Sequence, residues 1–143
     1  MNKLCAQSAT QLANLIRKGE VSSKEVVQAH LDRIEEVNPD VNAITVILGE
    51  SALKAAEQAD SASDEDKMRP FHGVPITIKE NIDLLGTPTT QGLAVNAEAM
   101  PARNAPIVDR MIAAGAIPIG RTNLPEMGAR LDTDNPLRGR TFN

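Results

Sequence analysis

The sequence is poor in aromatic residues. Its 143 residues include two Phe and neither Trp nor Tyr. A core must therefore be built from aliphatic side chains, and there is no aromatic platform on which nucleic-acid bases could stack. Basic residues are also in the minority, since 15 Lys and Arg stand against 19 Asp and Glu, a formal net charge of −4. Binding to nucleic acid or to an anionic membrane surface is therefore not expected.

Cysteine and histidine are scarce as well. The single cysteine, Cys5, excludes an internal disulfide and a cysteine-based zinc site, which fits a reducing cytoplasmic compartment. His30 and His72 have no Cys, His or carboxylate partner at metal-ligand spacing, so we expect neither a metal nor another cofactor. No apolar run has the length of a signal peptide core or a membrane span, and we expect a cytoplasmic protein.

What remains is the makeup of a globular α/β chain, with 41% hydrophobic and 24% charged residues. Two capping boxes, Ser8 with Gln11 and Ser22 with Glu25, predict the starts of two helices. The first helix is predicted to end at Gly19 and the second at Asn38-Pro39. Their predicted apolar stripes are Leu12, Leu15 and Ile16 in the first, and Val27, Leu31, Ile34 and Val37 in the second.

The pattern downstream alternates between strands and helices. It predicts a strand or extended connection over Val41–Leu48, a helix over Ser51–Ala62, a polar loop at Asp64–Lys67, a buried strand over Gly73–Lys79, a long loop over Leu84–Arg103, a helix capped by Asn104 and a strand over Ala116–Ile119. The last helix is predicted to bury Ile107, Val108, Met111 and Ile112 and to stop at Gly115. A strand–helix–strand unit joins parallel strands, so Lys79 and Arg121-Thr122-Asn123 should share one sheet edge. Pro118 is unusual in a strand, because it lacks a ladder donor.

Two short motifs resemble ligand-binding loops but fail on context. The segment Gly115–Thr122 has the glycine spacing of a phosphate loop, yet a helix precedes it where a strand is needed. Asp132-Thr133-Asp134-Asn135 resembles the start of a calcium loop, but Pro136 follows and the closing glutamate is missing. Neither motif predicts a site.

Lys79 is the most informative single residue. At the end of an apolar, β-branched run its stem should be packed and its ammonium partly desolvated, which disfavours the charged form and suits a general base. Alternatively, the side chain reaches out of the sheet edge into solvent or pairs with Glu80 or Asp83.

Three motifs around Lys79 resemble the amino-terminal part of the amidase signature family. They are Phe71-His-Gly-Val-Pro-Ile-Thr-Ile-Lys79-Glu-Asn81, Gly86-Thr-Pro-Thr-Thr90-Gln-Gly92 and Ala114-Gly-Ala-Ile-Pro-Ile-Gly-Arg-Thr-Asn123-Leu-Pro-Glu126. The resemblance implies the first part of a three-layer α/β/α fold with a mixed central sheet, preceded by surface helices. Residues 1–70 would be a helical region and linker, and residues 71–143 an incomplete catalytic core.

The same resemblance implies hydrolysis of carboxamide C–N bonds by a serine, cis-serine and lysine triad, without a cofactor. Lys79 matches the catalytic lysine of that triad, and Gly128, Ala129 and Arg130 match a segment that lines the acyl pocket. The substrate would be a small-molecule amide. Four residues depart from the family pattern, namely Leu93, Asn104, Arg121 and Arg138. They argue for an amidase rather than for the amidotransferase that modifies charged transfer RNA.

The Gly/Ser-rich stretch that supplies the family's serines does not occur in this sequence. We therefore expect the chain to carry only the lysine, to be inactive alone, and to self-associate or to need a second chain with the serine half. A truncated non-catalytic relic, an interaction fragment and one half of a split amidase remain alternatives. The DNA beyond the codon for Asn143 would distinguish them.

Overall fold

The computed structural model describes residues 2–143 and consists of two compact units. The first unit comprises Met1–Glu36, Leu48–Ile76 and Arg110–Ile119, and the second comprises Val37–Ile47, Thr77–Asp109 and Gly120–Asn143. Each unit is thus assembled from segments far apart in the chain. The domain division predicted at residues 70 and 71 stays a prediction.

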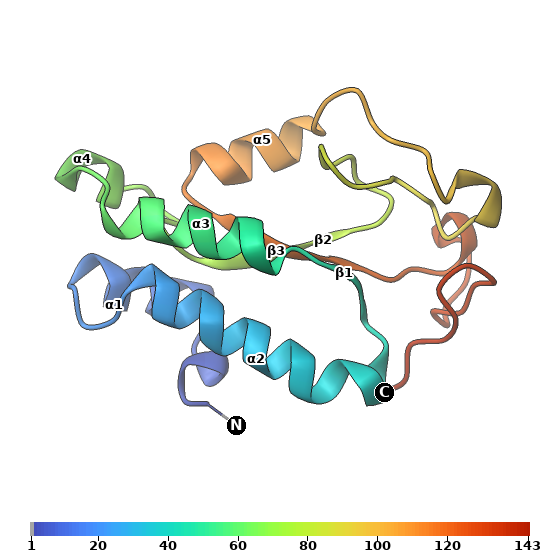
Figure 1. Ribbon diagram of the computed structural model, residues 1–143, viewed down its shortest axis with the longest axis horizontal. Coiled ribbons are helices and arrows are strands. Elements are labelled where there is room, and N and C mark those ends of the chain that lie inside the picture. The colour runs from blue at the N-terminus through green and yellow to red at the C-terminus, as the bar shows by residue number, and fades with distance from the viewer. Residues whose placement is uncertain (1) are drawn as a thin grey trace. The chain divides into compact units, whose positions relative to one another are not determined.

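Helices and strands alternate along the chain (Figure 1). The α-helices are α1 (Ala9–Arg17), α2 (Ser23–Val41), α3 (Gly49–Asp60), α4 (Asp64–Lys67) and α5 (Pro106–Ala113). The strands are β1 (Ile44–Ile47), β2 (Pro75–Lys79) and β3 (Ile117–Thr122). Short 3₁₀ turns are η1 (Leu4–Ala6), η2 (Ala94–Asn96) and η3 (Glu126–Gly128).

Local capping fixes the first two helices of the first unit. The Ser8 amide donates to Gln11 Oε1 at 2.7 Å, and the Gln11 amide donates back to Ser8 Oγ at 3.2 Å. The same exchange joins Ser22 and Glu25, at 2.8 and 3.1 Å. Both predicted capping boxes are confirmed, because each depends only on residues three positions apart.

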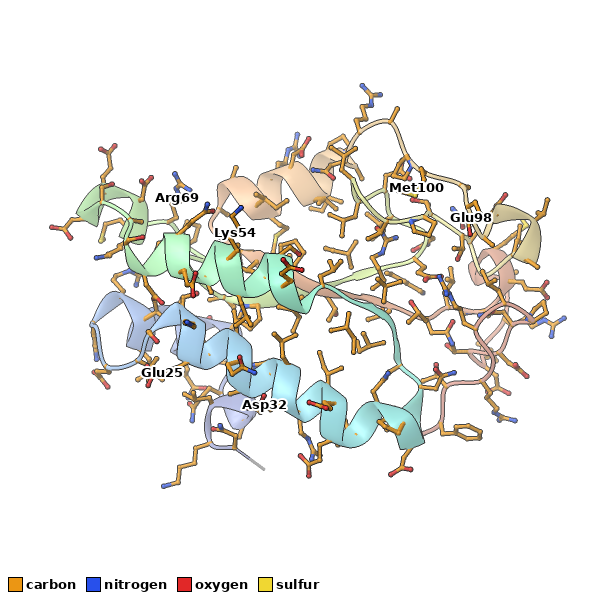
Figure 2. The ribbon with its side chains drawn as sticks, viewed as in Figure 1. Glu25, Asp32, Lys54, Arg69, Glu98 and Met100 are labelled. Atoms are coloured by element: carbon orange, nitrogen blue, oxygen red, sulfur yellow. The ribbon has the colours of Figure 1, made fainter. Side chains whose placement is uncertain are left out.

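The first unit is held together by two aliphatic clusters. In the second of these clusters, Val27 of α2 packs against residues of α3 and β3, and α2 and α3 run side by side (Figure 1). The charged side chains of α2, such as Glu25 and Asp32, are exposed (Figure 2). The first cluster contains Leu12, Ala13, Ile16, Val26 and Val74, and the second contains Val27, Ala52, Ala56, Ile117 and Ile119. Both cores are aliphatic, as the composition predicts.

The strands form a mixed sheet in the order β1-β3-β2. β1 is antiparallel to β3, with Ile47 opposite Gly120. Two backbone hydrogen bonds show that β2 and β3 are parallel. Ile117 N donates to Val74 O at 2.8 Å, and Glu80 N donates to Thr122 O at 3.0 Å, so residue numbers increase in the same direction along both strands. Pro118 is tolerated because it precedes the registered pairs with β1. The predicted mixed α/β fold and parallel crossover are confirmed.

The end of α2 differs from the prediction. The helix does not stop at Asn38-Pro39 but continues to Val41 with Pro39 inside it. It stops at Asn42, whose φ of 52° lies in the left-handed region. The Asn38 carboxamide accepts from the amides of Ala43 and Ile44 and thereby turns the chain into β1, which is shorter than the predicted Val41–Leu48 strand.

Three further predictions are wrong. Asp64–Lys67 is a helical turn rather than a loop, because Ser63 Oγ accepts from the Asp66 amide and acidic residues suit a helix start. Asn104 does not cap α5, because its side-chain oxygen accepts from the Leu85 amide at 2.7 Å instead. In α5 Val108 is buried, whereas Ile107 and Ile112 are exposed.

Candidate active site

The motifs around Lys79, Thr90 and Arg121 meet in the second unit. Arg121 Nη2 donates to the Lys79 carbonyl at 3.1 Å, which confirms that these residues share an edge of the sheet. The Gln91 amide points to the Glu80 carbonyl at 3.5 Å. Gly92 has a φ of 71°, and a Cβ there would lie 3.2 Å from the Leu124 carbonyl, so both the backbone and the close approach favour glycine. Segments separated by up to 42 residues are thus joined by hydrogen bonds.

Lys79 is the last residue of β2, and its side chain is exposed. The expectation of a packed and partly desolvated lysine is therefore wrong for this structure. The reason is the alternation of the strand, which turns Ile78 and Glu80 inward and Thr77 and Lys79 outward. The exposure agrees with the alternative in which the Lys79 side chain reaches into solvent, and the Glu80 carboxylate is bound by Arg138 instead. The catalytic role of Lys79 stays a prediction.

Glu80 is fully buried, with a side-chain exposure of 0%, and its carboxylate is surrounded by donors. Thr45 Oγ1 donates to it at 2.7 Å, Thr90 Oγ1 at 2.5 Å and Arg138 Nη2 at 2.8 Å. Burial raises the pKa of the carboxyl, but these donors outweigh burial and hold the pKa below its ordinary value. Glu80 is therefore an ionised group inside the second unit.

Arg121 is the other fully buried charge. Its guanidinium donates to Thr87 Oγ1 at 2.6 Å, to the Ile82 carbonyl at 2.8 Å and to the Lys79 carbonyl. Burial lowers the pKa of Arg121, and the charges of Glu80 and Asp83 oppose that shift. An arginine remains protonated under such conditions, so Arg121 fixes the backbone on either side of the turn that follows β2.

The proposed substrate-contact residues Gly128, Ala129 and Arg130 form an exposed turn. Met127 opens this turn with a φ of 53°, and its amide donates to the Gln91 carbonyl at 2.7 Å. The turn is thus tied to the Thr90-Gln91-Gly92 motif. No hydrogen bond described for residues 2–143 joins Gly128–Arg130 to Lys79, and their role in substrate binding stays a prediction.

Asparagines anchor the C-terminal segment within the second unit. Asn123 donates to the Gly139 carbonyl, and Asn135 donates to Asn123 and to the Leu124 carbonyl. Asn42 donates to the Arg138 carbonyl at 2.8 Å, and the Phe142 amide donates to the Val41 carbonyl, so the C-terminus lies beside the end of α2 (Figure 1). These bonds place Arg138 where it can reach Glu80.

Sequence reasoning missed Glu80, Arg138, Thr45 and Thr90 as one group. A carboxylate directly after a buried strand was the available signal, because such a group must find donors. Within the described part of the chain, no three His, Cys, Asp or Glu side chains are placed to hold a metal ion. None of the helices from residue 2 onward is long and apolar enough to cross a membrane.

The chain is thus a mixed α/β fold in which Lys79 lies at the end of a strand, next to the buried charged residues Glu80 and Arg121. The family model described as Amidase matches residues 25–143. The chain is 47% identical over 137 residues to an indoleacetamide hydrolase of Bradyrhizobium diazoefficiens, an alignment covering 95% of this chain and 26% of the relative. It is 38% identical over 144 residues to one subunit of the glutamyl-tRNA(Gln) amidotransferase of Salinispora tropica, covering 100% and 29%.

Solved structures agree with the sequence comparisons. A fatty acid amide hydrolase superposes with a TM-score of 0.92 at 29% identity, covering 99% of this chain and 25% of that protein. A 6-aminohexanoate cyclic dimer hydrolase with bound substrate superposes with a TM-score of 0.84 at 34% identity, covering 96% and 27%. The chain therefore belongs to the amidase family, and it spans about a quarter of the length of the curated relatives it matches.

Proposed function

We propose that this chain forms part of an amidase that hydrolyses carboxamide C–N bonds, with Lys79 as its general base. One observation carries the proposal: within the region that matches the family, Lys79 is an exposed lysine on a firmly held strand end. Its carbonyl is bound by Arg121, and the next residue, Glu80, is buried. An amine presented in this way can reach a nucleophilic hydroxyl supplied by another part of the enzyme.

In the proposed mechanism, neutral Lys79 accepts the proton of a serine hydroxyl through a second, bridging serine. The serine oxygen then bonds to the amide carbon, and the proton passes to the nitrogen as the C–N bond breaks. Water releases the acyl group from the serine in the second half of the reaction. Gly128, Ala129 and Arg130 are proposed to contact the acyl part of the substrate.

The serines present in the chain support the proposal that it supplies the lysine alone. Ser23 is buried, and its hydroxyl donates to the Gly73 carbonyl at 2.9 Å. The hydroxyls of Ser8, Ser22 and Ser63 cap helix starts. The hydroxyl of Ser51 donates to the Leu48 carbonyl and that of Ser61 to the Glu57 carbonyl. Each hydroxyl thus has a structural partner and none lies in a glycine-rich turn that would expose a nucleophile. We therefore propose that the 143 residues have no amidase activity by themselves.

For the substrate, we propose a small-molecule amide. The identity of 47% to an indoleacetamide hydrolase, against 38% to the amidotransferase, supports an amidase over an enzyme acting on charged transfer RNA. The departures at Leu93, Asn104, Arg121 and Arg138 point the same way. A cytoplasmic location and the absence of a cofactor stay predictions.

A fusion tests the proposal directly. The whole chain replaces the matching quarter of the Bradyrhizobium relative, so that the remainder of that enzyme would supply the serines. We expect the fusion to hydrolyse indoleacetamide and the isolated chain to leave it unchanged. A fusion that folds, as circular dichroism would show, but has no amidase activity would contradict the proposal, as would hydrolysis by the isolated chain.

A further inference from the structure

Glu80 is the buried residue just past the end of β2, in the second unit. It directly follows Lys79, and because neighbouring side chains of a strand point to opposite faces, one is buried where the other is exposed. The Glu80 amide also donates to the Thr122 carbonyl at 3.0 Å, so the backbone at this point is joined to β3. The buried carboxylate of Glu80 and the exposed amine of Lys79 are thus carried by adjacent residues of one held stretch of backbone.

The donors to Glu80 come from three separate segments. Thr45 belongs to β1, Thr90 to the loop after β2, and Arg138 to the C-terminal segment. Their sequence separations from Glu80 are 35, 10 and 58 residues. One carboxylate thus joins the end of β2 to three other segments. An isolated ion pair at the surface would join it to one segment only and would contribute little stability.

Burying a carboxylate is costly, and a neutral apolar side chain would suit a purely structural position better. A charged group with three converging donors is instead a device that fixes one conformation, since its hydrogen bonds are short, strong and directional. The residue directly before this buried group in the chain is Lys79.

We propose that Glu80 is a positioning residue for Lys79, holding the end of β2 so that the lysine amine is aimed at the reacting serine. This inference rests on the proposed function, because it assigns Lys79 the role of base. Arg138 serves as the counter-charge that completes the carboxylate's set of donors, and Arg121 holds the Lys79 carbonyl independently. Glu80 touches neither substrate nor the reacting atoms and acts only through Lys79.

The isotopically labelled full chain provides a readout that needs no catalysis. Glu80→Gln keeps the size of the side chain but places an amide group against the Arg138 guanidinium. We expect the backbone order parameter at Lys79 to fall from about 0.85, the value of rigid backbone, towards 0.6. Lys67 of α4 should not change, nor should either lysine in the control Glu98→Gln, whose side chain is exposed on the loop after β2 (Figure 2).

The fusion enzyme provides the catalytic readout. Glu80→Gln should lower kcat by about 10- to 100-fold and leave KM within twofold, because misaimed catalytic groups slow chemistry without weakening substrate binding. Activities are divided by the folded fraction, which removes the effect of lost stability. In a Lys79→Met background, Glu80→Gln should lower the residual rate less than twofold, since a positioning residue has nothing left to position.

The outcomes separate the two proposals. If Lys79→Met leaves the fusion fully active, the proposed function fails, and the order parameters of the chain alone decide whether Glu80 fixes Lys79. The positioning role is overturned if Lys79→Met is inactive but Glu80→Gln keeps the native kcat. It is also overturned if Glu80→Gln lowers the rate by the same factor in the native and in the Lys79→Met background. If Glu80→Gln does not fold, Thr90→Val removes one of the three donors, and a smaller kcat loss with unchanged KM is expected. An unchanged kcat in that variant overturns the proposal.

Discussion

Glu80 and Arg138 form an ion pair with a separation of 2.8 Å, although they are 58 positions apart in the sequence. The carboxylate has a side-chain exposure of 0% and the guanidinium one of 24%. This asymmetry decides the energetics, because Arg138 can turn to water when its partner is lost, whereas Glu80 cannot. Removal of the cation should therefore cost more than removal of the anion.

Substitutions at this pair test that asymmetry. Arg138→Met leaves a buried carboxylate without its counter-charge and should lower the free energy of unfolding by about 3 kcal/mol or more. Glu80→Gln should cost about 1–3 kcal/mol, the usual range for a hydrogen bond to a charged group. Denaturant unfolding of both variants and the double variant provides the measurement. The control Arg140→Met removes an exposed side chain and should stay within about 0.5 kcal/mol. Equal losses at positions 138 and 140 would contradict the structure.

Acid should weaken the same pair. The pKa of Glu80 in the folded chain lies below its unfolded value of about 4.3, so the folded state binds its proton less readily. The resulting stabilisation is present above the unfolded pKa and disappears as the pH falls through the folded pKa. The difference in unfolding free energy between the native chain and Glu80→Gln should therefore be constant from pH 7 to about 6 and shrink below about pH 4. A difference that grows on acidification would show the opposite shift.

Two glycines at helix ends provide a matched test of packing in the first unit. Gly19 follows α1 and Gly115 follows α5, with φ values of 69° and 95°. An added Cβ meets nothing within 4 Å at Gly19, but it would lie 2.7 Å from the His72 backbone at Gly115. Gly19→Ala should cost about 1 kcal/mol for its left-handed conformation. Gly115→Ala should cost at least about 2 kcal/mol more, because the backbone itself must move. Equal melting temperatures for the two variants would refute the close approach.

Local signals in the sequence predicted local structure well. Ser8 with Gln11 and Ser22 with Glu25 fixed helix starts because both partners lie within one turn. Asn104 failed as a cap because its side chain accepts from Leu85, 19 residues away, and no local pattern contains that partner. Tertiary contacts of this kind override capping preferences.

The same distinction holds for the site. The strand–helix–strand pattern predicted that Lys79 and Arg121 share a sheet edge, because the crossover rule needs only the order of elements. The donors of Glu80 come from β1, a loop and the C-terminal segment, so only the folded chain reveals them. The sequence left open whether Lys79 is packed or reaches into solvent, because an apolar run does not by itself say which face of a strand is buried.

Self-association of the isolated chain remains a prediction that the strand order makes specific. β2 stands at one end of the order β1-β3-β2, so one of its edges has no neighbouring strand within the described sheet. Sedimentation should show association that increases with concentration. Thr77→Lys places a charge on the exposed face of β2 and should weaken it, whereas Thr10→Lys on α1 should not. A monomer at every concentration, with a sharp thermal transition, would contradict this prediction.

Lys79 is proposed to be the base of an amidase, and kcat/KM of the fusion enzyme tests this role most directly. Lys79→Met keeps the length of the side chain and removes the amine, whereas Lys67→Met makes the same change on α4. We predict that Lys79→Met lowers kcat/KM for indoleacetamide at least about 100-fold, the usual contribution of a general base, and that Lys67→Met leaves it within twofold. Equal activity of the two folded variants would contradict the claim.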